Sequence, residues 1–138
     1  MMSLTYKKLL KHSKTTHTLN SIQYLLEWDQ ETQMPSDGIQ HRIEQISTLA
    51  STLHKHKTKP IFKKNLLQLI SLEDGKVKDL SLSFQEQAVV KEWRRQYLQN
   101  KKIPSSFVQK FSSLTAASQH VWAEAKKNDD FKTFSPYL

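Results

Sequence analysis

The 138-residue sequence contains no cysteine, only two glycines and four prolines, and no long apolar run. Without cysteine there is no disulfide framework and no thiolate zinc site. An all-β protein needs frequent turns rich in glycine and proline, so their scarcity favours long helices. No apolar run reaches the ~20 residues that span a bilayer, and residues 1–14 lack the apolar core of a secretory signal. We therefore expect a soluble, helical, cytoplasmic protein without a membrane segment.

Acidic residues are also few: 13 Asp and Glu face 21 Lys and Arg, which gives a net charge of +8. One segment holds five lysines and no acid: Lys55, Lys57, Lys59, Lys63 and Lys64. Clustered lysines bind phosphates by releasing counterions, so binding to nucleic acid is one hypothesis. The other basic residues are mixed with acids along the chain. The pattern therefore favours a solvated face and argues against a nucleic-acid partner.

Apolar residues recur at helical spacing and predict an all-α fold of five to six helices with no sheet. The predicted helices cover residues 4–32, 39–55, 60–72, 83–103 and 105–125, with a further helix start at 135–136. Ser83 and Glu86 are placed as a capping box for the fourth helix. Small residues at positions 116–118 would let a neighbouring helix approach the fifth helix closely.

Each predicted helix carries an apolar stripe that we expect to face the core. The stripes are Tyr6, Leu9, Leu10, Leu19, Ile22, Leu25 and Leu26; Ile39, Ile43, Ile46, Ala50 and Leu53; Phe62, Leu66, Leu69 and Ile70; Val89, Trp93 and Tyr97; and Val108, Phe111, Leu114 or Thr115, Ser118, Trp122 and Ala125.

The last residues favour a truncated chain. Ser135 and Pro136 predict an N-cap followed by proline at the first helical position, yet the sequence stops at Leu138. The last eight residues also include four large apolar side chains, which is unusual for a free terminus. A frayed polar tail is the alternative interpretation.

None of the six histidines has the spacing of a helical zinc site, which requires two histidines four residues apart with an adjacent glutamate, H-E-x-x-H. His12 and His17 are five apart, His54 and His56 are two apart, and His41 and His120 stand alone. We predict packing or surface roles for all six. The chain is expected to contain no catalytic residue and no metal ligand.

Glu27, Asp29 and Glu31 gather at the C-terminal end of the first predicted helix, where the helix dipole disfavours negative charge. Glu27 and Glu31 are one turn apart on one face, whereas Asp29 points roughly opposite. A general acid/base pair is one hypothesis. Pairing with an arginine or with backbone amides is the favoured one, and Arg42 is the nearest basic candidate.

Residues 28–35, W-D-Q-E-T-Q-M-P, resemble the W-D-Q-E-T-x-M-P signature of carboxypeptidase Taq-type zinc metallocarboxypeptidases. Residues 42–54 are similar to the family's R-x-x-Q…L…L-x-H helix, and residues 94–104 to its R-R-x-Y…K-L-P stretch. Residues 122–125 and 130–138 are similar to its W-x-x-A and D-F-x-x-F-x-P-Y-L segments. The resemblance is collinear over nearly the whole chain.

The resemblance implies a helix-rich zinc peptidase, typically a homodimer, that removes amino acids from peptide C-termini. The family's H-E-x-x-H helix, its third metal-ligand glutamate and its substrate-binding arginine lie beyond the equivalent of Leu138. It follows that residues 1–138 form a single N-terminal helical segment without the catalytic region, and that zinc or another divalent metal belongs to the full-length family only. The motif residues implied to be structural or groove-lining are Trp28, Asp29, Gln30, Glu31, Met34, Pro35, Arg42, Trp122, Asp130 and Phe131.

The leading functional hypothesis is an N-terminal fragment of a metallocarboxypeptidase that forms groove wall and packing surface and is inactive alone. Its expected partner is the missing catalytic region, or a second chain that supplies it, and exposed apolar faces would also allow self-association. Two alternatives stay open. One is a free-standing basic helical module that binds protein or nucleic acid, and the other is a decayed gene product.

Overall fold

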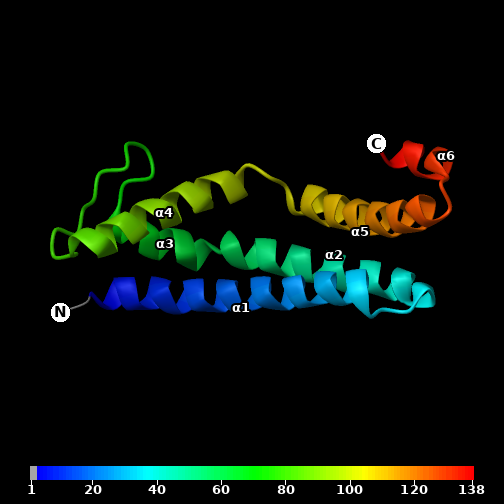
Figure 1. The fold of residues 1–138 in the computed structure, drawn as a ribbon. Helices are drawn as coiled ribbons and strands as arrows, with labels where there is room; N and C mark the ends of the chain where they lie inside the picture. The colour runs from blue at the N-terminus through cyan, green and yellow to red at the C-terminus, as the bar shows by residue number, and fades with distance from the viewer. Residues whose placement is uncertain (1–2) are drawn as a thin grey trace. The chain divides into compact units, whose positions relative to one another are not determined.

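The computed structural model describes residues 3–138, which form helices joined by short turns and one longer loop (Figure 1). The helices are α1 (Leu4–Thr32), α2 (Ile39–Lys57), α3 (Pro60–Leu69), α4 (Phe84–Lys101), α5 (Ser105–Lys127) and the short α6 (Phe131–Phe134), with 3₁₀ turns η1 (Ser36–Gly38) and η2 (Ser135–Tyr137). Within residues 3–138 no strand forms, and a single isolated bridge pairs Ile70 with Val77. The prediction of an all-α fold is confirmed.

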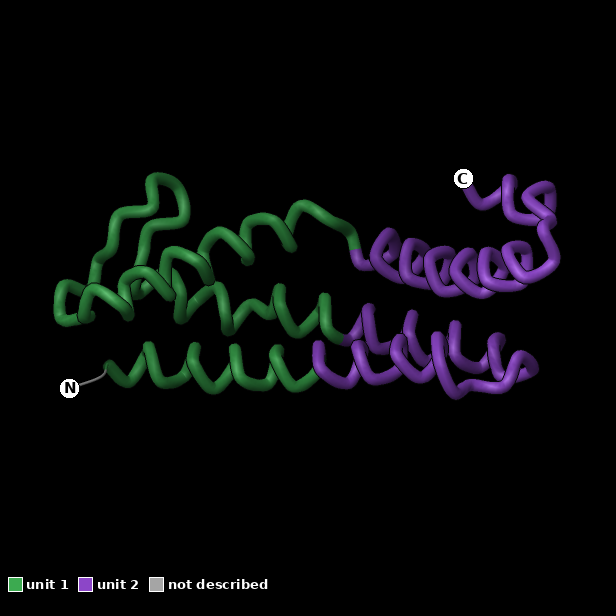
Figure 2. Tube along the Cα trace, viewed as in Figure 1, with its two compact units in different colours: residues 1–19, 53–104 green, residues 20–52, 105–138 purple. Residues whose placement is uncertain are grey.

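These helices build two compact units, each described by itself (Figure 2). Unit 1 comprises the chain up to Leu19 and residues 53–104, and unit 2 comprises residues 20–52 and 105–138. Both α1 and α2 therefore contribute to both units. Most of the lysines and arginines belong to unit 1, whereas most of the acids belong to unit 2. No helix of the described residues is long and apolar enough to cross a membrane.

Unit 1 has a continuous apolar core. Its buried members are Tyr6, Leu9, Phe62, Leu66, Leu69, Ile70, Leu82, Val90, Trp93 and Tyr97. The predicted stripe of α3 is confirmed, although the helix ends at Leu69 because Ile70 adopts extended backbone and bridges Val77.

In α4 the expected burial of Val89 is wrong, because Val89 is 37% exposed and Val90 is fully buried. Two successive steps of four residues drift around the helix by about 40° each, whereas steps of three and four stay on one face. Val90, Trp93 and Tyr97 follow the second pattern, and all three are buried.

The loop between α3 and α4 is fixed by hydrogen bonds from a side chain of α4. The guanidinium of Arg94 donates to the backbone carbonyls of Ser71, Leu72 and Glu73 at 2.7–3.1 Å. Gly75 supplies the left-handed backbone that the turn needs, with φ +75°. The loop then ends in the predicted capping box, which is confirmed by reciprocal hydrogen bonds between residues 83 and 86.

The buried residues of unit 2 are mostly small, with Ile46 as the large exception. Ile46 and Ala50 of α2 and Ala116 and Ala125 of α5 are all at most 6% exposed. The α2 stripe is thus confirmed for Ile46, Ala50 and Leu53, whereas Ile39 and Ile43 are only partly buried. The α5 stripe is largely wrong, because its large members are roughly half exposed or more: Phe111, Leu114 and Trp122. Likewise Ile22 and Leu25 of α1 are exposed.

The approach of α1 to α5 explains this difference. Gln30 of α1 donates from Nε2 to the backbone carbonyl of Ala116, 3.0 Å away, and Ala116 is buried. A side chain reaches that carbonyl because the residue there is small. The contact therefore forms at the predicted small patch of α5, and the bulky side chains lie elsewhere on the helix surface.

The expected helix start at Ser135 is wrong. Asp130 caps α6 instead, because its carboxylate accepts a hydrogen bond from the backbone N–H of Thr133. Ser135 donates its hydroxyl to the carbonyl of Lys132 and begins only a 3₁₀ turn. Helix α5 ends before this point because Asp129 adopts a left-handed conformation, with φ 52°. The chain changes direction there, and Asp130 is therefore in position to cap α6.

Candidate functional site

All ten predicted motif residues lie in unit 2. Seven of them come from the C-terminal end of α1, the turn that follows it and the start of α2: Trp28, Asp29, Gln30, Glu31, Met34, Pro35 and Arg42. Trp122 lies on α5, and Asp130 and Phe131 lie where α6 begins. The structure thus brings the motif residues into one unit, in two separate groups.

Arg42 pairs with Asp29, as the sequence predicts. A guanidinium nitrogen of Arg42 lies 2.6 Å from Oδ2 of Asp29, and the other terminal nitrogen donates to the carbonyl of Leu26 at 2.6 Å. Nε donates to the side chain of Gln45. The Arg42 side chain is only 13% exposed. It joins the end of α1 to the start of α2 and brings positive charge to the negative end of the α1 dipole.

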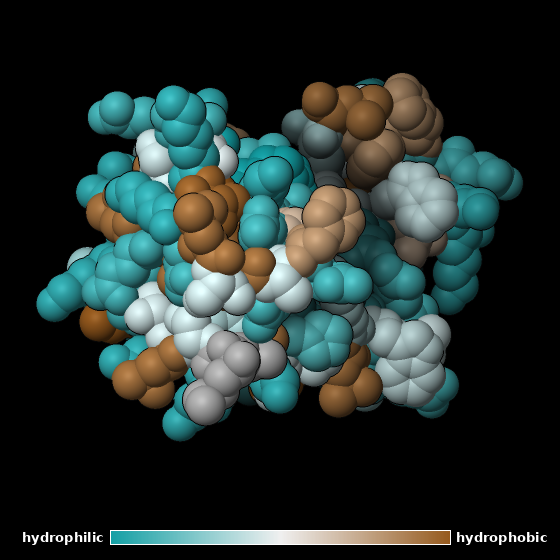
Figure 3. Space-filling view, turned by 90° about the vertical axis from the view of Figure 1, so that its left-hand side faces the viewer, coloured by the Kyte–Doolittle hydropathy of each residue, from teal (hydrophilic) through white to brown (hydrophobic). Residues whose placement is uncertain are grey.

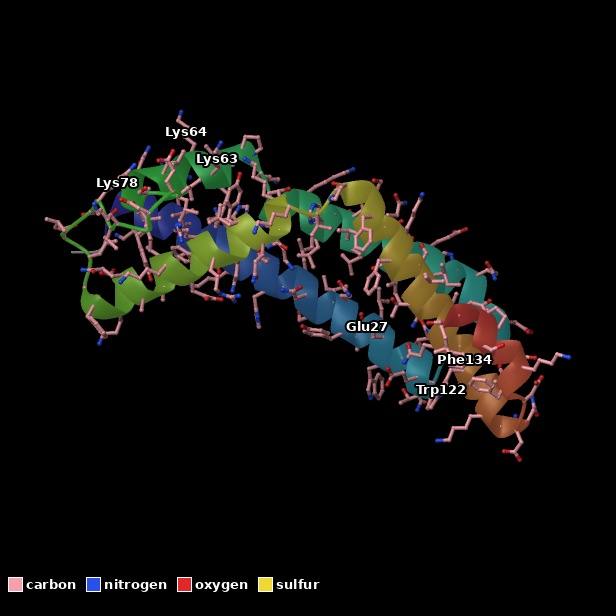
Figure 4. The ribbon with its side chains drawn as sticks, turned by 90° about the horizontal axis from the view of Figure 1, so that it is seen from above. Glu27, Lys63, Lys64, Lys78, Trp122 and Phe134 are labelled. Carbon is pink, nitrogen blue, oxygen red and sulfur yellow. The ribbon has the colours of Figure 1, made fainter. Side chains whose placement is uncertain are left out.

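Glu27 and Glu31 take no part in this pair and face a hollow of about 430 Å³, which we call the α1–α5 hollow. Its lining is Gln23, Glu27 and Glu31 of α1, Ile46 of α2, and Phe111, Ser112, Thr115, Ala116, Ser118 and Gln119 of α5. Figure 4 shows the position of Glu27 along α1. The volume falls in the range of small-ligand sites.

Two glutamine amides orient these carboxylates. Gln23 donates from Nε2 to Oε1 of Glu27 at 2.8 Å, and Gln119 donates from Nε2 to Oε1 of Glu31. Across residues 3–138, no lysine, arginine or histidine forms an ion pair with either glutamate. Sequence reasoning places the two glutamates on one face of α1 but misses Gln119, because a contact 88 residues away leaves no local signal.

The remaining α1 motif residues have structural or surface positions. Gln30 reaches Ala116, and its Oε1 is buried without a hydrogen-bond partner. Trp28 is 55% exposed. The backbone N–H of Met34 donates to the carbonyl of Asp29, and the carbonyl of Pro35 accepts from Gly38, so both residues shape the turn between α1 and α2.

A second hollow, of about 330 Å³, lies between α5 and α6 and is lined by Trp122, Ala125, Lys126, Asp129, Asp130, Phe131 and Phe134. Figure 4 labels Trp122 and Phe134 near this end of the chain. The ammonium of Lys126 lies 5.1 Å from the Trp122 ring centroid. Hydrogen bonds from the hydroxyl and backbone N–H of Thr133 lower the pKa of Asp130. Asp130 thus acts as a helix cap in its charged form.

The part of the chain that the structure describes holds no cluster of metal-ligating side chains. Among residues 3–138, no group of three or more His, Cys, Asp or Glu side chains lies close enough together to hold a metal ion. Three of the histidines pack against other parts of unit 1, whereas His17 and His41 are exposed. The rings of His12 and His56 stack in unit 1 at a centroid distance of 3.8 Å, and His54 is 8% exposed. The sequence gives no sign of the His12–His56 pair because its members are 44 residues apart.

The His12–His56 pair predicts a loss of stability in acid. Burial, with the nearby positive charges of His56 and Lys59, lowers the pKa of His12 from 6.5 to about 4. Between these values the unfolded chain binds a proton that the folded chain does not, so stability is full above pH 6.5 and falls as the pH approaches 4. We expect the melting temperature to drop over this range, and to drop less in His12→Leu, as measured by circular dichroism. An unchanged slope in the variant would contradict this role.

The lysine cluster lies in unit 1 and is mostly solvated. Lys55, Lys59 and Lys64 are exposed, whereas burial lowers the pKa of Lys57. Figure 4 labels Lys63 and Lys64 beside Lys78, whose ammonium donates to the carbonyl of Leu67 on the same helix as the first two. On the face in Figure 3, hydrophobic side chains are interspersed with hydrophilic ones.

The sequence and the structure were compared with those of known proteins. A family model described as carboxypeptidase Taq (M32) metallopeptidase matches residues 8–138. Thermostable carboxypeptidase 1 of Thermus thermophilus is 30% identical over 135 residues, which cover 96% of this chain and 25% of that protein. Carboxypeptidase 1 of Bacillus subtilis is 32% identical over 114 residues, covering 83% and 22%. The solved structure named "BsuCP Crystal Structure" superposes with a TM-score of 0.86 at 27% identity, covering 98% of this chain and 26% of that one.

These matches identify the chain as a helical segment related to metallopeptidases. The chain belongs to the carboxypeptidase Taq (M32) family and aligns with the N-terminal quarter of its carboxypeptidases. It spans about a quarter of the length of the curated relatives that it matches. The family resemblance seen in the motifs is therefore confirmed.

Proposed function

We propose that this chain forms part of the substrate-groove wall of a metallocarboxypeptidase that removes C-terminal amino acids from peptides, and that it supplies no group to the hydrolytic step. The match of residues 8–138 to the M32 family carries this proposal. The gathering of the motif residues in unit 2, which also contains the α1–α5 hollow, supports a role in contacting substrate.

The metal and the attacking water belong to a catalytic region outside these 138 residues in this proposal. M32 is a metallopeptidase family, and zinc is the metal that we propose for the complete enzyme. The catalytic region would come from a longer polypeptide or from a second chain, in the cytoplasm. Exposed apolar side chains such as Phe111, Trp122 and Phe131 offer surface for that region, or for a second copy of this chain.

A chimera tests this function. We expect the chain alone, with added zinc or cobalt, to release no C-terminal amino acid from peptides. The same chain, replacing the N-terminal quarter of the Thermus thermophilus carboxypeptidase, should restore release that is absent from the enzyme lacking that quarter. Amino-acid release is measured by chromatography after host peptidases are removed.

Two results would contradict the proposal. One is peptidase activity in preparations of the isolated chain that stays with the chain through every purification step. The other is a chimera that folds, as judged by circular dichroism, and binds one zinc ion per chain but releases no amino acid. The intact Thermus enzyme is the positive control.

A further inference from the structure

The α1–α5 hollow presents hydrogen-bond acceptors. Each glutamate uses one carboxylate oxygen for a glutamine amide, which leaves the second oxygen of each available. The hydroxyl of Thr115 donates to the carbonyl of Phe111, and that of Ser118 donates to the carbonyl of Thr115. Their hydrogens are therefore already committed to α5, so these two oxygens offer lone pairs only. The two carboxylates and the two hydroxyl oxygens therefore favour a ligand that carries hydrogen-bond donors.

The electrostatics call for positive charge. Glu27 and Glu31 stand at the C-terminal end of α1, whose last turn contains no basic residue. The helix dipole disfavours negative charge there, and Arg42 neutralises Asp29 but pairs with neither glutamate. Unit 2 as a whole also carries most of the chain's acids. A cation in the hollow would relieve the repulsion between two carboxylates that lie one turn apart.

The apolar part of the lining suits a side chain with a hydrocarbon stem. Ile46 and Ala116 are buried beside the hollow, and Phe111, which also lines it, is 59% exposed. An arginine buries its stem along apolar surface and presents a planar fork of five donors to carboxylates. Its guanidinium also stacks on aromatic rings. A lysine offers a single charged point and matches two separate carboxylates less well.

We propose that the α1–α5 hollow binds the side chain of an arginine residue in a peptide, with Glu27 and Glu31 as its ligands. The binding site is a property of this chain, and its role as a substrate subsite rests on the proposed function. In the complete enzyme it would favour peptides that carry arginine at the position that reaches unit 2.

Binding is tested on the full 138-residue chain by nuclear magnetic resonance, titrating acetyl-Gly-Arg-Gly-amide into ¹⁵N-labelled protein. We expect saturable shifts at the amides of residues that line the hollow. The matched peptide with citrulline in place of arginine keeps the shape and loses the charge, and it should bind about 10-fold more weakly or not at all. Equal shifts with the two peptides, or shifts confined to other residues, would overturn the proposal.

Glutamate variants locate the site. Glu27→Gln and Glu31→Gln should each weaken binding of the arginine peptide by about 10-fold, since each removes a charge-assisted hydrogen bond. Glu44→Gln is the matched control, because the Glu44 side chain is 79% exposed and does not line the hollow. Its affinity should be unchanged. Equal losses in all three variants would indicate a general charge effect and would also overturn the proposal.

The same variants separate this inference from the proposed function. In an active chimera, Glu27→Gln should lower kcat/KM for arginine-containing peptides and leave the citrulline peptides unaffected. An active chimera without that difference would contradict the arginine subsite and leave the groove-wall function standing. An inactive chimera whose isolated N-terminal chain still prefers the arginine peptide would contradict only the function.

Discussion

Replacing Leu66 by alanine is expected to lower the free energy of unfolding by about 3 kcal/mol. Leu66 is fully buried in the core of unit 1, where it belongs to the same cluster as Phe62, Leu69 and Trp93. The substitution removes apolar contacts and leaves a cavity that surrounding side chains only partly fill. Domains of this size have a total stability of roughly 5–15 kcal/mol, so the loss is a large fraction of it.

Leu67→Ala provides the matched control, because Leu67 lies on the same helix and undergoes the same change in helix propensity, but it is 37% exposed. Its effect should be about 1 kcal/mol or less. Urea unfolding followed by circular dichroism and by tryptophan fluorescence measures both variants. Equal losses in the two variants would show that Leu66 is not at the centre of a packed core.

Arg42→Ala is expected to destabilise the protein by about 2–3 kcal/mol, although the change lies near the surface. The guanidinium is 13% exposed and bonds both Asp29 and the carbonyl of Leu26. Its removal leaves a partly buried carboxylate without a counter-ion. It also restores the unfavourable interaction of that charge with the α1 dipole. Arg42→Lys should recover part of the loss, because one ammonium cannot reach both partners with the same geometry.

Comparison with Arg95→Ala shows how much burial adds to the stabilising effect of the Arg42 ion pair. Arg95 forms an ion pair with Glu92 at the same 2.6 Å distance, but the two side chains are 56% and 45% exposed. Solvent screens such a pair, so its loss should change stability far less than the loss of Arg42. Thermal melts of the two variants make the comparison. An Arg42 variant as stable as the Arg95 variant would show that the Arg42 contacts do not stabilise the fold.

Much of the helical framework could be predicted because its signals are local. Apolar spacing gives α2 and α3 their buried faces, and the Ser83–Glu86 box is formed by residues within one turn. The Arg42–Asp29 pair was also predictable, since the two residues flank a single short turn. Each of these features depends on residues at most 13 positions apart, so periodicity and capping chemistry are enough to find them.

The amino-acid order alone thus determined where the helices lie, which family motifs the chain carries and that no H-E-x-x-H pair is present. Tertiary packing decided which face of α5 is buried, that His12 stacks on His56, and that Gln119 orients Glu31 at the edge of a hollow. The physical reason is the separation along the chain between the residues that interact. Helix formation depends on residues that are neighbours along the chain. Side-chain burial and charge pairing depend instead on which distant helix packs nearby, and this is determined only when the whole chain folds.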